Sequence, residues 1–357
     1  MRIIRFAVIT ATLIGATALF QAQQGYDQPK LHPKETHLRN IKQLTFGGEN
    51  AEAYFSGDGK QVVFQSKRAP FKCDQIFTMN VDGSSTKMVS SGQGRTTCAY
   101  FQPDGQRIIY ASTHLGSPDC PPDPDRSLGY VWALYRSFDI FSAKPDGSDI
   151  KRLTTTDRYD AEGTVSPDGK KILFTSLRSG DLEIWDMNLD GSQPRQLTNE
   201  LGYDGGPWHS QDGQWIVWRA SRPKTPDEEK VYKDFIAKDL VKPDKLEIMI
   251  MKADGTQKRQ LTSNGKANFA PYFHPNGRQI IFASNINNPN PRSPNFDLYV
   301  INRDGTGLQQ ITFDEGFDGF PMFSKDGRKM IWGSNRNGKS EGETNVFIAD
   351  WIDSGSF

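Results

Sequence analysis

One short pattern recurs six times along the chain of 357 residues: Asp-Gly or Asn-Gly, followed by an apolar stretch with an aromatic residue six positions after the Asp or Asn. These aromatic residues are Phe64, Tyr110, Phe174, Trp218, Phe282 and Trp332. Asp-Gly suits a tight hairpin because both turn positions tolerate positive φ, and aromatic and β-branched residues favour strands. A repeat of this size predicts an array of small sheets.

A second column of strand-like segments follows the first, as in DIFSAKPDG ending at Gly147 and EIWDMNLDG ending at Gly191. A short strand comes after each of the first five such turns, but the sixth repeat lacks it. The missing piece stands at the other end of the chain, as IKQLT at residues 41–45. An N-terminal strand given to the last sheet would hide both end edges, so we expect a closed ring.

The segment at 165–198, VSPDGKKILFTSLRSGDLEIWDMNLDGSQPRQLT, resembles the TolB-type propeller repeat. The resemblance extends over residues 41–353 and implies an all-β, six-bladed β-propeller of four-stranded antiparallel blades. TolB proteins carry an α/β domain before the propeller. Residues 23–40 alone separate the predicted signal from the first strand, so we expect this chain to lack that domain.

The N-terminus has the pattern of an export signal. Arg2 and Arg5 precede an apolar run from Phe6 to Phe20, and small residues follow near Ala22. We therefore predict a signal peptide at 1–22, a polar leader at 23–40, a propeller at 41–353 and a tail at 354–357. The expected location is the periplasm or the exterior; an uncleaved membrane anchor is the alternative.

Charge and hydropathy narrow the choice of partners. The chain carries 43 Lys and Arg against 43 Asp and Glu, which gives no basic excess for nucleic acid. No apolar segment after the signal is long enough to span a bilayer as a helix. We expect a monomer that takes a protein, peptide or glycan ligand in the cell envelope.

Two insertions, at 114–137 and 221–245, lengthen the second and fourth repeats. Both fall between the second and third strands of a blade, so they share one rim of the propeller, and long loops on a rigid scaffold are where binding sites are usually built. The insertion at 221–245 predicts a helix that is capped by Thr225, begins at Pro226 and extends toward Leu240. Aromatic residues between Tyr130 and Tyr135 would form a ligand platform if exposed, or anchor the loop if buried.

The start of each innermost strand supplies candidate ligand-binding residues. A first column, aligned by distance to the turn, contains Asn50, Thr96, Asp160, Asp204, Asn268 and Asp318. Two residues further on stand Glu52, Cys98, Glu162, Gly206, Ala270 and Phe320, which by strand alternation point the same way. Such a ring predicts a channel mouth that binds a cationic or polyhydroxylated ligand. Ca²⁺ at Asp160, Asp204 and Asp318 is a candidate cofactor. The structural alternative is that each Asp or Asn caps its own turn.

The chain has three cysteines, and all of them map to the same rim of neighbouring blades. An exported protein meets an oxidising compartment, so we expect one disulfide and one free thiol. The first choice is Cys73 with Cys98, and the second is Cys98 with Cys120.

Three functions are compatible with these features. The first is a non-catalytic binding propeller that uses its loop-rich face. The second is a lyase or hydrolase that acts on a polysaccharide or peptide, with Asp160, Asp204, Asp318, Glu52 or Glu162 as acid, base or metal ligand. The third is a Tol-Pal-like envelope component.

Overall fold

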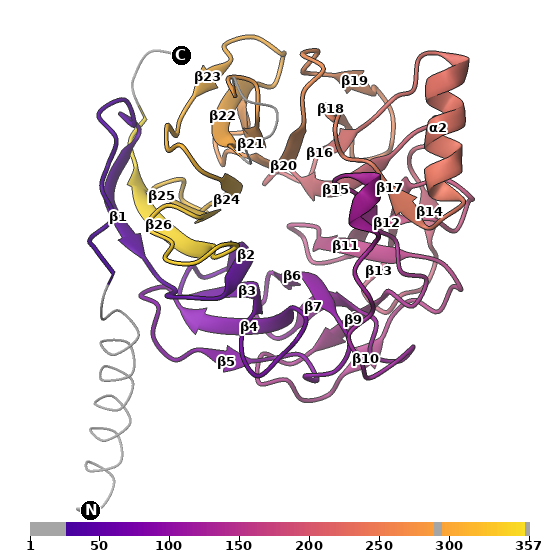
Figure 1. The fold of residues 1–357 in the computed structure, drawn as a ribbon, viewed down its shortest axis with the longest axis horizontal. Coiled ribbons are helices and arrows are strands. Elements are labelled where there is room, and N and C mark those ends of the chain that lie inside the picture. The colour runs from indigo at the N-terminus through magenta and orange to yellow at the C-terminus, as the bar shows by residue number, and fades with distance from the viewer. Residues whose placement is uncertain (1–25, 289–294, 354–357) are drawn as a thin grey trace, which may run out of the picture.

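The computed structural model describes residues 26–288 and 295–353, and these form six four-stranded antiparallel sheets around one axis (Figure 1). The predicted fold class is therefore confirmed. The signal predicted at 1–22 and the tail at 354–357 lie outside the described residues. Within the described ranges, no helix is both long and apolar enough to cross a membrane.

In blades one to five the strands run outward from the axis in chain order. Blade one contains β2 (Glu49–Phe55), β3 (Gln61–Lys67), β4 (Gln75–Asn80) and β5 (Lys87–Met88), and blade two contains β6 (Thr96–Phe101), β7 (Ile108–Ser112), β9 (Asp139–Ala143) and β10 (Lys151–Arg152). Blade three contains β11 (Asp160–Val165), β12 (Lys171–Ser176), β13 (Glu183–Asn188) and β14 (Arg195–Gln196), and blade four contains β15 (Asp204–His209), β16 (Trp215–Ala220), β18 (Glu247–Lys252) and β19 (Arg259–Gln260). Blade five contains β20 (Asn268–Phe273), β21 (Gln279–Ser284), β22 (Asp297–Asn302) and β23 (Gln309–Gln310).

Blade six closes the ring. It contains β24 (Asp318–Phe323), β25 (Lys329–Ser334), β26 (Asn345–Trp351) and the N-terminal β1 (Leu38–Gln43), which pairs antiparallel with β26. The donated strand begins three residues earlier than predicted, because a bulge at Asn40 lets Leu38 pair with Trp351. The indigo β1 and the yellow β26 accordingly lie side by side in Figure 1.

The repeated aromatic residues fill the interior of the blades. Phe64, Phe174, Trp218, Phe282 and Trp332 have no exposed surface, and Tyr110 is 1% exposed. Several stack on an aromatic residue of the next strand, as Trp332 does on Phe347 with ring centroids 5.8 Å apart. Each blade thus buries an aromatic residue at the same position of its second strand, which explains the regular spacing in the sequence.

Two further repeat positions act through hydrogen bonds. In the Asp-Gly turns the Gly takes positive φ, as Gly169 does at +68°, whereas the Asp does not. The Asp instead accepts bonds within the turn, as Asp168 does from Ser166 Oγ at 2.6 Å. The Thr of each Leu-Thr pair accepts a bond from the third strand, as Thr198 Oγ1 does from the Ile184 amide at 2.8 Å.

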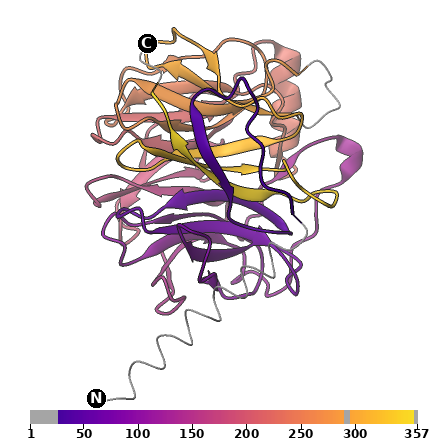
Figure 2. The same cartoon turned by 90° about the vertical axis from the view of Figure 1, so that its left-hand side faces the viewer.

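The insertions meet at one rim. β8 (Trp132–Ala133) of the second-blade insertion pairs antiparallel with β17 (Leu240–Val241) of the fourth-blade insertion, and a short 3₁₀ helix, η1 (Arg126–Leu128), precedes β8. Figure 2 shows the second-blade insertion in magenta, projecting from one face of the ring. Helix α2 (Pro226–Ile236) is capped by Thr225 as predicted, but it ends before Leu240, which enters β17 instead.

Candidate functional site

The two columns at the channel mouth separate in space. In every innermost strand the register shifts just after the first-column residue, as between Ala161 and Thr164 of β11. The second-column residue sits in this bulge at positive φ, from +50° for Ala270 to +62° for Gly206. Because a bulge breaks the alternation of side chains, the prediction that both columns point the same way is wrong.

The first column is buried, and its side chains are bonded within their own blade or to the neighbouring blade. Its six residues, Asn50, Thr96, Asp160, Asp204, Asn268 and Asp318, are at most 1% exposed. Arg178 Nη2 donates to both carboxylate oxygens of Asp160 at 3.0 Å, and Ser176 Oγ donates to the same group at 2.5 Å. These side chains tie the innermost strand to the loop after the second strand.

We call this pairing of a first-column side chain with the loop after the second strand the clamp. It recurs where the residue types permit. Arg222 Nη2 lies 2.7 Å from Asp204 Oδ1, and Arg336 Nη2 lies 2.8 Å from Asp318 Oδ2. In blade one, Arg68 donates to Asn50 Oδ1 at 2.7 Å. In the remaining blades, Thr96 donates to the Asp74 carbonyl at 3.1 Å and Asn268 accepts from Ser284 Oγ at 2.7 Å.

The calcium site predicted at Asp160, Asp204 and Asp318 is not assembled. Each of these carboxylates is paired with a different arginine. Across residues 26–288 and 295–353, no group of three or more His, Cys, Asp or Glu is arranged to hold a metal ion. A cation would have to displace the paired guanidinium at each position.

The second column lines a small cavity in the channel, of about 30 Å³. Cys98 Sγ lies 3.6 Å from Glu52 Oε1, and Glu162 forms an ion pair with Arg219 from β16. Burial raises the pKa of Glu52 to about 7. Glu162 also accepts bonds from Thr175 Oγ1 at 2.6 Å and from the Gly206 amide at 2.8 Å.

Gly206 makes room for this ion pair. A Cβ on Gly206 would lie 2.3 Å from Arg219 Nη1, so a larger residue would collide with the guanidinium. Arg219 also donates to the Tyr203 hydroxyl at 3.0 Å and lies over the ring of Trp132, 5.0 Å from its centroid. The insertion that carries Trp132 therefore reaches the edge of the channel.

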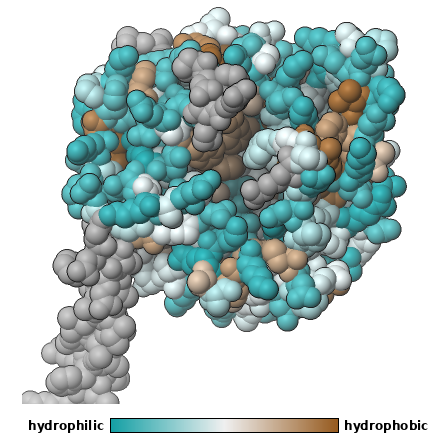
Figure 3. Space-filling view, in the orientation of Figure 1, coloured by the Kyte–Doolittle hydropathy of each residue, from teal (hydrophilic) through white to brown (hydrophobic). Residues whose placement is uncertain are grey.

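Aromatic rings fill the channel beneath the cavity. Trp208 makes edge-to-face contacts with Tyr54, Tyr100 and Tyr272, with centroids 4.8 to 5.0 Å apart. On the side of blades five and six, Phe269 packs against Phe296, Phe317 and Phe320. Figure 3 shows apolar side chains in the hollow near the middle of this face, within a mostly hydrophilic rim. The cavity has space for one or two water molecules.

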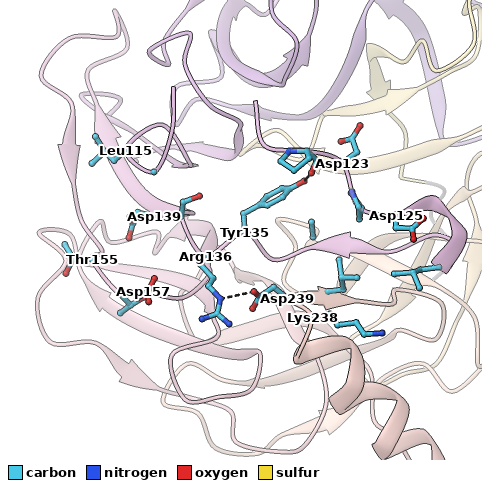
Figure 4. A pocket seen from close by; sticks show the side chains of 18 of the residues that line it. Leu115, Asp123, Asp125, Tyr135, Arg136, Asp139, Thr155, Asp157, Lys238 and Asp239 are labelled. Carbon is cyan, nitrogen blue, oxygen red and sulfur yellow. Dashed lines mark hydrogen bonds and ion pairs between the residues drawn. The ribbon is translucent and has the colours of Figure 1, made fainter. Parts of the chain in front are cut away.

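A larger depression, which we call the rim groove, lies between the two insertions and has a volume of about 820 Å³ (Figure 4). Its lining residues are Leu115, Gly116, Pro122, Asp123, Pro124, Asp125, Leu128, Ala133, Tyr135, Arg136, Ser137, Asp139, Arg152, Thr155, Thr156, Asp157, Lys238, Asp239 and Leu240. Arg136 Nε donates to Asp239 Oδ2 at 2.8 Å. This bond links the second-blade insertion to the fourth-blade insertion beside the β8–β17 pair.

In the aromatic segment from Tyr130 to Tyr135, some residues are buried and anchor the loop, and others are accessible to a ligand. Val131 is 7% exposed and Leu134 is 2% exposed, so these residues anchor the loop. Tyr130 is 75% exposed, and Tyr135 lies half-buried in the groove wall, where its hydroxyl donates to the Pro122 carbonyl at 2.6 Å. The groove therefore has a fixed inner wall and an exposed outer edge.

The disulfide joins Cys73 to Cys120, with Cα atoms 5.7 Å apart, and Cys98 is free. Both predicted pairings, Cys73 with Cys98 and Cys98 with Cys120, are therefore wrong. The bulge in β6 places Cys98 in the channel cavity beside Glu52, away from the rim loops. Cys120 fastens the second-blade insertion to the loop between β3 and β4 of blade one.

No protein-family model matches the chain. A TolB homolog of Chlorobium luteolum is 28% identical over 160 residues, which are 38% of this chain and 36% of that protein. A Tol-Pal system protein TolB of Anaeromyxobacter dehalogenans is 28% identical over 133 residues, 37% of this chain and 26% of its own length. The chain thus spans about a third of the length of these relatives. A solved structure described as putative TolB from Agrobacterium tumefaciens aligns with a TM-score of 0.58 and 16% identity, over 87% of this chain and 97% of that one.

The chain is a TolB-like six-bladed β-propeller. An uncharacterized peptidase of Bacillus subtilis is also similar, at 24% identity over 216 residues, which are 56% of this chain and 31% of that protein. Similar sequence therefore occurs in proteins with different names, and the similarity by itself indicates the fold rather than the function.

Two structural features of this TolB-like propeller were missed from the sequence. Three of the four arginines that pair with the first column follow the second strand in a Ser-x-Arg pattern, at FQSKR, FTSLR and WGSNR, and that pattern was visible. Glu35, within the segment interpreted as a polar leader, is 1% exposed and accepts a bond from Arg336 Nη2 at 2.9 Å. Its nearest sequence neighbours give no sign of this contact.

Proposed function

We propose that this protein is an exported, non-catalytic binding propeller that takes a protein, peptide or glycan in the rim groove. The observation that carries the proposal is the pairing of β8 with β17, which makes two insertions from different blades into the walls of one groove. The groove is large enough for part of a polymer, whereas the channel cavity has space only for water.

The chemistry of the groove suits a polar chain with some apolar groups. Leu115 is 58% exposed at its edge, and Tyr135 presents a ring with a polar tip. Asp157 and Lys238 are exposed in the lining, and neither forms an ion pair with another residue that the structure describes. Such unpaired charges are available to a partner at low desolvation cost.

An extracytoplasmic location supports the proposal. The disulfide between Cys73 and Cys120 is of the kind that persists in oxidising compartments. The similarity to TolB proteins points to the same side of the membrane. We therefore propose the periplasm or the exterior as the place of action, after removal of residues 1–22.

A capture experiment with two matched variants tests the proposal. The groove variant is Leu115→Ala with Lys238→Glu, and the control is Leu308→Ala with Lys170→Glu, which changes exposed residues of the same types outside the groove. A photo-crosslinker at position 115 or 308 identifies the occupant in an envelope extract. We expect crosslinks from position 115, and at least about a tenfold loss of capture for the groove variant only. Equal capture by both variants would refute the groove as the binding site.

A second candidate, a channel-mouth lyase or hydrolase, is favoured by Glu52 alone. Its carboxyl lies in an enclosed cavity with its pKa raised to about 7 by burial, as a general acid or base requires. If the protein shortens polysaccharide or peptide chains in the same extract and the Glu52→Gln variant does not, the result would favour this function. Crosslinking to a peptidoglycan-associated lipoprotein would instead favour a Tol-Pal-like role.

A further inference from the structure

The outer wall of the rim groove, by which we mean residues 114–130 of the second-blade insertion, has almost no hydrophobic core of its own. Between His114 and Tyr130, none of the side chains that the structure describes is buried. A segment that buries so little apolar surface gains little free energy from packing. Its position therefore depends on a few specific links to the rest of the propeller.

Among the described residues, four links hold this wall, and they cluster between Pro118 and Asp123. The disulfide attaches Cys120 to Cys73, and Arg95 Nη2 donates to Asp123 Oδ1 at 2.9 Å. The Tyr135 hydroxyl donates to the Pro122 carbonyl, and the Gly94 amide donates to the Pro118 carbonyl at 2.8 Å. Asp123 is 60% exposed at its side chain, so its ion pair with Arg95 is screened by solvent. The disulfide is the one covalent link among the four.

The disulfide leads directly into the groove. Cys120 is followed after one residue by Pro122, Asp123 and Pro124, all of which line the groove. Cys73 is 2% exposed and sits in blade one, a different sheet from the insertion that it holds. Cutting this bond would remove the covalent link to blade one and leave the three hydrogen-bonded links in place.

We propose that the Cys73–Cys120 disulfide is a redox latch that keeps the rim groove in its binding shape, and that reduction by a dithiol opens the wall and lowers binding. The inference rests on the proposed function, because it assigns a regulation to that same groove. It requires only that the wall loosens while the six blades stay folded.

The exchange reaction has a defined course. A thiolate of the dithiol attacks Cys120 Sγ, because Cys120 is partly exposed whereas Cys73 is buried. The disulfide breaks, a mixed disulfide forms on Cys120, and Cys73 leaves as a thiolate that takes a proton from water. The second thiol of the reductant then attacks its own mixed-disulfide sulfur, which releases Cys120 and leaves the reductant as a cyclic disulfide.

The surroundings of Arg95 and Cys98 are consistent with this exchange reaction. The Arg95 guanidinium is 4.0 Å from Cys120 Sγ, where it favours the Cys120 thiolate that is released in the second step. Cys98 stands apart from the exchange, because it lies in the channel cavity and burial raises its pKa well above the ordinary value. The free thiol is therefore a poor competitor for the latch.

Hydrogen exchange measured by mass spectrometry tests the latch in the full mature chain. The protein carries Cys98→Ser, so that Cys73 and Cys120 are the remaining cysteines, and it is compared before and after treatment with dithiothreitol. We expect amide exchange in residues 116–131 to become about tenfold faster or more, while exchange in β12 stays unchanged. The open control, Cys98→Ser with Cys73→Ala and Cys120→Ala, should exchange fast with or without the reductant.

Capture by the same proteins separates this inference from the proposed function. We expect the crosslinks from position 115 to fall on reduction to the level of the open control. Unchanged exchange in 116–131 after reduction would overturn the latch, and so would faster exchange with equal capture in both redox states. Faster exchange together with no capture even by the oxidised protein would overturn the proposed function while supporting the latch as a mechanical link.

Discussion

The channel cavity and the rim groove lie on the same face but are built in opposite ways. The cavity is lined by residues from repeated positions, and its charged groups are matched internally, as Arg219 is with Glu162. The groove is lined by insertions that occur once each, and it contains the unpaired charges of Asp157 and Lys238. Depth and charge alone would have favoured the cavity as the working site.

This difference indicates which part of such a propeller can bind a partner. A buried ion pair that is fully satisfied contributes to the integrity of the blades, since breaking it leaves an uncompensated charge. Exposed and unpaired groups on loops are free to meet a partner. We therefore expect substitutions in the cavity to change stability and substitutions in the groove to change binding.

The largest expected effect is that of Arg219→Ala. The substitution leaves Glu162 without its cation in a place where the two side chains are 9% and 12% exposed, so the free energy of unfolding should fall by about 3–5 kcal/mol. The matched groove variant, Arg136→Ala, removes a side chain that is 46% exposed and should cost less than about 1 kcal/mol. Urea unfolding followed by tryptophan fluorescence measures both. Similar losses for the two variants would contradict the division between cavity and groove.

The second effect concerns the dependence of stability on pH. The pKa of Glu52 is about 7 in the folded chain against 4.5 ordinarily, so the folded state keeps a proton that the unfolded chain releases. Stability due to Glu52 is thus fully present below pH 4.5 and is lost as pH rises to about 7, by roughly 3 kcal/mol. Glu52→Gln should remove this loss, so its melting temperature relative to the unmodified protein should rise between pH 4.5 and 7.

A groove acid provides the control for that measurement. Bonds from the Ser127 amide and hydroxyl lower the pKa of Asp125, which is the opposite direction to Glu52. Asp125→Asn should therefore leave the pH profile between 4.5 and 7 unchanged. A profile for Glu52→Gln that stays parallel to that of the unmodified protein would contradict the burial of Glu52.

The blades could be predicted from the sequence because their signals are local and repeated. Each Asp-Gly turn and each aromatic residue, such as Phe174, acts within its own hairpin, and six copies reinforce the interpretation. The ring closure followed from one missing strand and one spare segment, now seen as β1 beside β26. These features need only short-range rules of turn and strand formation.

The candidate site could not be predicted to the same extent, for two physical reasons. The bulge puts ordinary residues such as Glu52, Cys98 and Glu162 at positive φ, and these residue types give no local sign of it. The groove depends on Ala133 meeting Leu240, a pairing between insertions of different blades. The disulfide was mispredicted for the first reason, because the bulge turns Cys98 inward.

A smaller effect tests the bulge itself, through Gly206. Gly206→Ala and Gly213→Ala place a Cβ at similar positive φ, +62° and +69°, so both share the same backbone strain. Only the first Cβ meets another atom within 4 Å, Arg219 Nη1 at 2.3 Å, so Gly206→Ala should lose about 1–3 kcal/mol more than Gly213→Ala in urea unfolding. Because the added loss comes from displacing Arg219, it should largely disappear in an Arg219→Ala background. An undiminished loss there would mean that the guanidinium does not occupy the space above Gly206, and that the cavity is not closed by this ion pair.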